Sequence, residues 1–190
     1  MTQRKKKSES VADDRKAVTG TSAQGTASLV TKPAYEETNF VDTSQPVWNY
    51  SLLTDEDVSN FQNGTHYTLY EKFGSHSRQV NNQWGMYFCV WAPNGTSVSV
   101  MGNFNDWKPH QYELNPRWDK SGIWEGFIPG FKLGESYKYH IVGYEGREVD
   151  KGDPFANFWE KRPNTASITW DMYYEWKDAK WLETRKKNNS

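Results

Sequence analysis

The fold is decided by residues 84–100, which read WGMYFCVWAPNGTSVSV. In the first part, Trp84–Trp91, every position except one glycine carries an apolar side chain, which is typical of a β-strand covered on both faces. Pro93-Asn94-Gly95 then provides a turn. After the turn, Val98 and Val100 alternate with serines, and this alternation indicates a second strand with one face in solvent.

Further short strands follow on the C-terminal side of this pair. They are predicted over Gly122–Ile128, Glu135–Val142 and Thr165–Trp170. Because no helical pattern separates them, we predict an all-β protein, an antiparallel β-sandwich over about residues 77–170. Trp84, Trp91 and Trp124 each lie within a strand pattern, so we expect them in its core.

The flanking segments differ from the sandwich in composition. Residues 1–33 have almost no large apolar side chain and cannot offset the entropy of ordering, so we expect a disordered tail. Residues 34–76 are predicted to be an extension with short helices. Thr54, followed three residues later by an aspartate, has the spacing of a capping box and predicts a helix over Asp55–Gln62. Residues 171–190 are charged and rich in helix formers, which predicts a helical linker.

The charge balance and the single cysteine restrict the class of protein. Lys plus Arg number 23 and Asp plus Glu 24, so the net charge is −1 and we expect no nucleic-acid partner. No stretch approaches the roughly 18 consecutive apolar residues of a membrane span, so we expect no membrane association. Cys89 lies inside the apolar strand, which indicates a buried, reduced thiol in a cytoplasmic protein.

No pattern in the sequence points to catalysis. His66, His76, His110 and His140 are scattered, with no pair at the spacing of metal ligands. Motifs of hydrolases, zinc peptidases and phosphate-binding loops do not occur. We therefore expect no catalytic residue, no metal and no cofactor. The 190 residues are also too few for a (β/α)₈ barrel, which needs about 250 residues.

The candidate binding site is the loop after the second strand, residues 102–107, with the sequence GNFNDW. Glycine, asparagine and aspartate permit a tight loop with unusual backbone angles. Trp107 at its tip is well placed to offer its indole to the C–H face of a sugar ring, with Asn105 and Asp106 beside it to bond hydroxyls. The alternative is that Trp107 folds back as a lid over the edge of the sandwich.

Several segments, in order, resemble one known family. They are YTLYEKFGSH (67–76), FCVWAPNGTSVSVMGNFNDW (88–107), SGIWEGFIPG (121–130) with YKYHIVGY (137–144), and DPFANFWEKRPNTASITWDMYYEW (153–176). Together they resemble the N-terminal part of bacterial glycogen branching enzymes. The second segment resembles the signature of the family-48 carbohydrate-binding module. The resemblance implies an immunoglobulin-like sandwich attached to an α-amylase-type catalytic barrel.

The resemblance also implies which residues bind and which react. Such enzymes cleave an α-1,4-glucan and rejoin the fragment through an α-1,6 bond, using two carboxyl groups of the barrel, and none of these maps onto this sequence. In related modules, including the glycogen-binding domain of the AMP-activated kinase β subunit, a loop tryptophan stacks on glucose and a strand lysine bonds it. Trp107 and Lys138 match them. A second stacking tryptophan has no match in residues 146–149, which weakens expected binding by about 1–3 kcal/mol.

The expected partners follow from the same resemblance. They are an α-glucan, such as glycogen or a maltooligosaccharide, and the catalytic barrel of the parent chain. Trp170, Trp176 and Trp181 are predicted to pack against that barrel. Two alternatives stay open: a free-standing glycogen-targeting module, and the equivalent module of a debranching or trehalose-forming relative.

Overall fold

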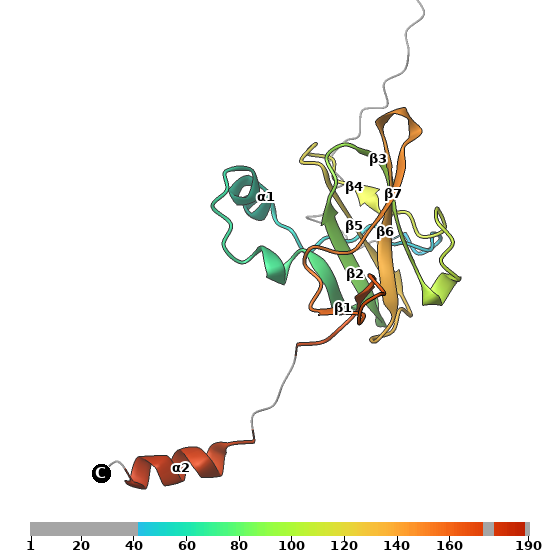
Figure 1. Cartoon of the computed structure of the whole chain (residues 1–190). Helices are drawn as coiled ribbons and strands as arrows, with labels where there is room; N and C mark the ends of the chain where they lie inside the picture. The colour runs from blue at the N-terminus through green and yellow to red at the C-terminus, as the bar shows by residue number, and fades with distance from the viewer. Residues whose placement is uncertain (1–41, 173–176, 189–190) are drawn as a thin grey trace, which may run out of the picture. The chain divides into compact units, whose positions relative to one another are not determined.

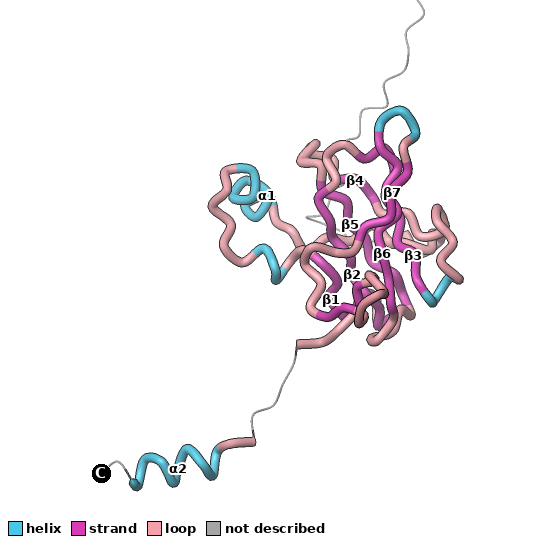
Figure 2. Tube along the Cα trace, in the orientation of Figure 1, coloured by secondary structure: helices cyan, strands magenta, loops and turns pink. Residues whose placement is uncertain are grey.

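Two antiparallel sheets form the body of the protein in the computed structural model, which describes residues 42–172 and 177–188 (Figure 1). One sheet has the order β1 (Gly74–Val80), β2 (Gln83–Trp91), β5 (Ile123–Pro129) and β4 (Asn115–Pro116). The other has the order β3 (Gly95–Gly102), β6 (Ser136–Gly143), β9 (Ser167–Ile168) and β8 (Phe158–Trp159), with β7 (Glu148–Lys151) paired to β6. The predicted all-β sandwich is therefore confirmed (Figure 2). The expected disordered tail lies outside the described residues.

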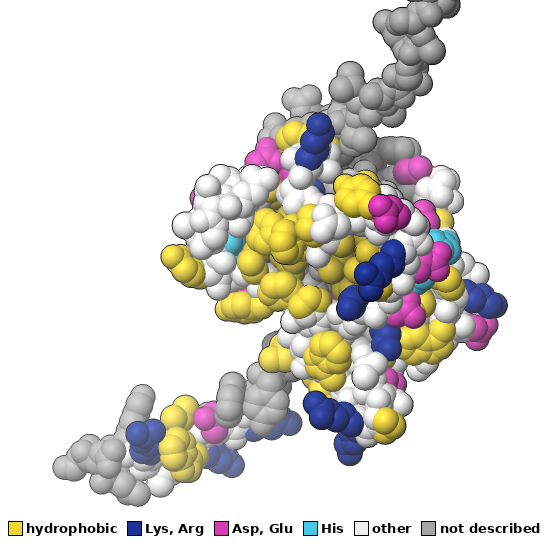
Figure 3. Space-filling model, turned by 45° about the horizontal axis from the view of Figure 1, so that its top comes forward, with side chains coloured by type: hydrophobic (Ala, Val, Ile, Leu, Met, Phe, Trp, Pro, Cys, Tyr) yellow, Lys and Arg dark blue, Asp and Glu magenta, His cyan; other side chains and the backbone are white. Residues whose placement is uncertain are grey.

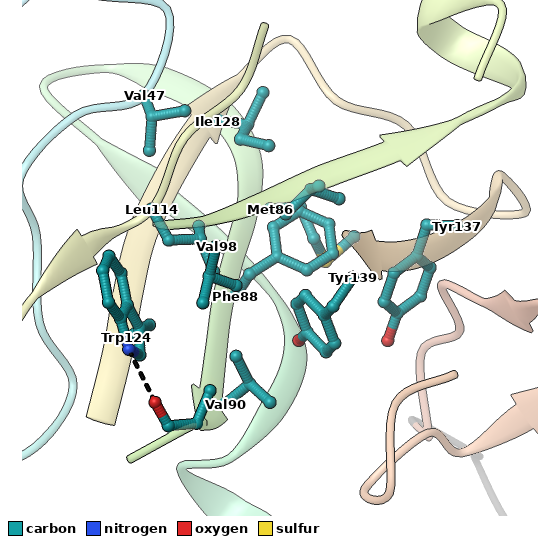
Figure 4. Packing of buried hydrophobic residues seen from close by; sticks show 12 residues of the cluster. Val47, Met86, Phe88, Val90, Val98, Leu114, Trp124, Ile128, Tyr137 and Tyr139 are labelled. Carbon is teal, nitrogen blue, oxygen red and sulfur yellow. Dashed lines mark hydrogen bonds between the residues drawn. The ribbon is translucent and has the colours of Figure 1, made fainter. Parts of the chain in front are cut away.

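The main core lies between the two sheets. Its central residue, Phe88 of β2, is fully buried and meets the rings of Tyr137 and Tyr139 of β6 edge-on, with ring centroids 5.1 and 6.4 Å away (Figure 4). Trp124 of β5 is also buried, and its indole Nε1 donates to the backbone oxygen of Ala92 at 3.1 Å. The apolar positions of each strand thus meet on the inner faces, as alternation requires.

A second hydrophobic cluster covers the outer face of the first sheet. Tyr87, Cys89 and Phe127 point into it, and the preceding extension contributes Trp48 and Val58. This cover explains why β2 is apolar on both faces. Cys89 is fully buried, and burial raises the pKa of its thiol, so the thiol is poorly reactive.

The predicted N-terminal helix is confirmed as α1 (Asp55–Gln62). The backbone N–H of Asp57 donates to Oγ1 of Thr54 at 3.1 Å, and the backbone N–H of Thr54 donates to Oδ2 of Asp57 at 2.8 Å. These two bonds close the capping box. A short 3₁₀ turn follows at η1 (Leu69–Glu71). The helix α2 (Ala179–Asn188) falls within the predicted linker, and no helix of the described residues is long and apolar enough to cross a membrane.

Two core assignments are wrong. Trp84 and Trp91 lie at the ends of β2 and are 64% and 54% exposed, whereas Trp124 is buried as predicted. Alternation assigns a residue to a face of the sheet, but the covering layers do not extend over the strand ends. Trp91 lies edge-on to Phe61, with ring centroids 5.9 Å apart, and its indole Nε1 donates to the backbone oxygen of Ser121 at 3.1 Å.

Four strands were not predicted. β1 carries mostly polar side chains and stands at the edge of its sheet, and β4, β7 and β8 are two, four and two residues long. Short or polar edge strands have no apolar alternation to detect. Pairing with a neighbouring strand defines them.

Two buried carboxylates connect distant segments to the core. Asp153 is fully buried, and its Oδ2 accepts hydrogen bonds from the hydroxyls of Tyr137 at 2.7 Å and Tyr139 at 3.0 Å. Glu125 of β5 accepts from Nη1 of Arg117 at 2.6 Å, with side chains 6% and 5% exposed. Each carboxylate is bonded, as a buried charge must be.

Candidate functional site

The loop after β3 is shaped by one glycine and one asparagine. A Cβ on Gly102 would lie 2.0 Å from the backbone oxygen of Ser136, so only glycine lets β3 approach β6 there. Asn105, in the 3₁₀ turn η2 (Asn103–Asn105), is buried. Its Oδ1 accepts from the backbone N–H of Gly102 at 2.9 Å, and its Nδ2 donates to the backbone oxygen of Lys108 at 2.8 Å. The Asn105 side chain therefore holds the loop closed.

Backbone geometry presents the tryptophan at the tip of this loop. Asp106 and Trp107 have φ of 54° and 58°, and such left-handed angles are tolerated best by Asp, Asn and Gly. Trp107 is fixed from both ends, because its backbone N–H donates to Gly102 O at 2.9 Å and its indole Nε1 to Oδ1 of Asn103 at 2.9 Å. The indole is 36% exposed, so it is neither sealed in the core nor fully in solvent.

A surface groove of about 540 Å³ lies beside this indole. It is lined by Asn103, Trp107, Lys138, Glu160, Pro163, Asn164, Thr165 and Ala166. Lys138 comes from the outer face of β6, where alternation with the buried Tyr137 and Tyr139 predicted it. Its Nζ donates to Oγ1 of Thr165 at 2.8 Å. This bond fixes the ammonium group in the lining of the groove.

The segment between β8 and β9 forms another wall of the groove. Glu160 is anchored there, since its Oε1 accepts from the hydroxyl of Ser136 at 3.2 Å and its Oε2 from the backbone N–H of Ala166 at 3.1 Å. Asn164 lines the same wall. An indole face, an ammonium donor, a carboxylate and an amide thus surround one open space, which is the combination that a polyhydroxylated ring with apolar C–H faces requires.

The structure sorts the four predicted site residues into two pairs. Trp107 and Lys138 line the same groove, although they come from a loop and a strand. Asn105 lies beneath the loop with its amide engaged, and Asp106 does not line the groove, its side chain being 83% exposed. Sequence reasoning missed the wall from Glu160 to Ala166, because nothing in that segment shows that it folds across β6.

The predicted barrel-facing residues are placed only in part. Trp170 is 49% exposed and stacks on Phe158, with ring centroids 4.9 Å apart. Trp181 of α2 is 58% exposed. Trp176 lies outside the described residues.

The chain is similar to several known proteins. Residues 72–156 match carbohydrate-binding module 48 (isoamylase N-terminal domain). The 1,4-alpha-glucan branching enzyme GlgB of Thermosynechococcus vestitus is 47% identical over 135 residues, which are 70% of this chain and 17% of that protein. The GlgB of Aquifex aeolicus is 43% identical over 141 residues, 74% of this chain and 22% of that protein. A pullulanase from Bacillus acidopullulyticus aligns with a TM-score of 0.43 and 20% identity over 53% of this chain and 12% of that chain.

The sandwich is an immunoglobulin-like carbohydrate-binding module of family 48. The chain that carries it is similar to 1,4-alpha-glucan branching enzymes over 70% and 74% of its own length, in line with the resemblance that the order of the sequence segments indicated. It spans 17% and 22% of the length of these two curated relatives.

Proposed function

We propose that this chain is the non-catalytic accessory region of a 1,4-α-glucan branching enzyme, and that its groove binds glucose units of glycogen or maltooligosaccharides. The observation that carries the proposal is the convergence of Trp107 and Lys138 on one groove. The indole stacks on a pyranose ring and the ammonium group bonds its hydroxyls. Transfer of a glucan chain from an α-1,4 to an α-1,6 linkage then belongs to a catalytic barrel outside these residues.

The expected affinity is modest. Among the described residues that line the groove, Trp107 is the single aromatic side chain. One stacking face supplies about 1–3 kcal/mol, and a single site of this kind binds weakly unless several glucan chains are engaged together. Glycogen, with its many chain ends, should therefore be retained better than a short maltooligosaccharide.

The second part of the proposal is contact with the catalytic barrel. Phe158, Trp159, Trp170 and Met172 are 43–70% exposed and adjoin the C-terminal end of the sandwich in sequence. Figure 3 shows one face of the molecule on which hydrophobic side chains gather. Several exposed apolar residues together mark an interface, and we propose that Trp170, Trp176 and Trp181 contact a catalytic barrel of the same parent chain.

The buried thiol of Cys89 supports a cytoplasmic location.

The test of the glucan site is affinity electrophoresis in gels with and without glycogen, with isothermal titration of maltoheptaose as a second measurement. Trp107→Ala should weaken binding about 5- to 150-fold, the equivalent of 1–3 kcal/mol. Lys138→Ala should also weaken it. Trp84→Ala is the matched control, because Trp84 is exposed but does not line the groove. Equal retardation of wild type and Trp107→Ala would remove Trp107 from the site.

One observation separates the remaining alternatives. A coding frame that continues past Ser190 into a barrel favours the branching-enzyme assignment or that of a debranching or trehalose-forming relative, and a stop codon there favours a free-standing targeting module. The purified chain should form no new α-1,6 linkage from amylose. Formation of such linkages would contradict the non-catalytic assignment.

A further inference from the structure

Three side chains from three different segments meet on the outer face of the second sheet. They are His110 from the loop after η2, His140 of β6 and Glu148 of β7. One potential ligand atom from each lies within 4.8 Å of the other two. The glucan groove uses none of these residues.

The orientation of His140 points to a ligand. Its side chain is 7% exposed, and Nδ1 lies 2.8 Å from Oδ1 of Asp150. A ring that donates Nδ1–H to a carboxylate carries its lone pair on Nε2, which is the arrangement of zinc-bound histidines. Nε2 is buried and has no hydrogen-bond partner within the described residues. It faces Oε2 of Glu148 at 3.7 Å, which is too long for a hydrogen bond.

The backbone holds the second histidine over the first. The backbone N–H of His110 donates to Oγ of Ser99 at 3.1 Å, and Ser99 is the residue paired with His140 across β3 and β6. The two imidazoles are 5.0 Å apart between centroids at an angle of 84°. A carboxylate also lies near His110, whose Nδ1 is 3.5 Å from Oε1 of Glu113.

The distances between these ligand atoms suit one small metal ion if the side chains move slightly closer together. Ligand atoms around tetrahedral Zn²⁺ bond at about 2.0–2.1 Å and so lie about 3.3 Å from one another. The side chains of His110 and Glu148 are 46% and 58% exposed and can close onto the fixed His140. Two imidazoles and one carboxylate, with a fourth position open to water, form a donor set that Zn²⁺ and its first-row neighbours prefer over Mg²⁺ or Ca²⁺.

We propose that His110, His140 and Glu148 bind one divalent transition-metal ion of the Zn²⁺ class, with Asp150 orienting His140. The site lies on the same face of β6 as Lys138, two residues away along the strand. It is independent of the proposed glucan groove, and either one can exist without the other.

Binding of Zn²⁺ is measured by equilibrium dialysis with elemental analysis and by isothermal titration, on protein without a histidine tag. Wild type should bind one equivalent of Zn²⁺ in the presence of millimolar Mg²⁺. His110→Gln and Glu148→Gln replace exposed side chains, so they should fold, and each should weaken binding at least tenfold. Asp150→Asn should weaken it about 10- to 100-fold, the usual effect of losing a carboxylate that orients a ligating histidine.

Matched controls come from the same chain. His76→Gln alters a histidine of the other sheet, whose Nε2 lies 2.9 Å from the backbone oxygen of Phe73, and should leave Zn²⁺ binding unchanged. Glu145→Gln, in the neighbouring 3₁₀ turn η3 (Tyr144–Gly146), should do the same. Failure of wild type to bind one equivalent overturns the proposal. Unchanged binding by His110→Gln and Glu148→Gln overturns it equally.

Discussion

Replacing Asp153 by alanine should lower the free energy of unfolding by about 2–6 kcal/mol. The change leaves the hydroxyls of Tyr137 and Tyr139, both fully buried, without the carboxylate oxygen to which they now donate at 2.7 and 3.0 Å. A buried donor without an acceptor costs about 1–3 kcal/mol, and there are two. The loss is large beside a typical total stability of about 5–15 kcal/mol.

A double-mutant comparison isolates the cause. Tyr137→Phe together with Tyr139→Phe should destabilise the wild type but stabilise the Asp153→Ala variant, because there it removes the orphaned hydroxyls. The backbone N–H of Phe155 also loses its bond to Asp153, but this loss is common to both variants and cancels. Urea unfolding followed by circular dichroism gives the four free energies. Equal effects of the two phenylalanines in both backgrounds would refute the reasoning.

Three further predictions concern buried groups. Arg117→Met should cost about 3–5 kcal/mol in urea unfolding, because it leaves Glu125, 6% exposed, without its cation, and a cost below about 1 kcal/mol would contradict this. Trp124→Ala should lower the free energy of unfolding by about 3–5 kcal/mol and Trp84→Ala by less than about 0.5 kcal/mol, because Trp124 is 8% and Trp84 64% exposed. Similar losses in the two variants would contradict this difference in burial. Burial raises the pKa of Asp153, so the folded state holds the proton of this carboxyl group more tightly than the unfolded state does. The resulting contribution to the free energy of unfolding is complete below about pH 4 and is lost as pH rises through the folded pKa. The stability advantage of wild type over Asp153→Asn should therefore shrink as pH rises from about 4, and an advantage that grows with pH would count against it.

Much of the fold was predictable from local patterns. The two-faced apolar run of β2, the alternation of β3 and β6 and the capping box of α1 all appear in the structure where the sequence indicates them. Each signal lies within a few consecutive residues, so no knowledge of distant contacts is needed. Burial was less predictable, as Trp84 and Trp91 show, because it depends on what covers a strand end.

The candidate sites divide in the same way. The loop with Trp107 and the outward position of Lys138 follow from residue type and alternation. The groove that they share with Glu160 does not follow from residue type or alternation, because the order of strands in the sheet brings the segment before β9 next to β6.

Periods and turns within short segments of the sequence predict the sandwich and the face on which each strand residue lies, but they leave open whether the indole of Trp107 is exposed or folds back. Which faces of the sheets meet depends on contacts between segments that are distant in the sequence. Strand order brings His110, His140 and Glu148 within 4.8 Å of one another, although their spacing along the chain shows no metal-ligand pattern. Strand pairing is set by packing across the whole domain, so no local signal in the sequence carries it.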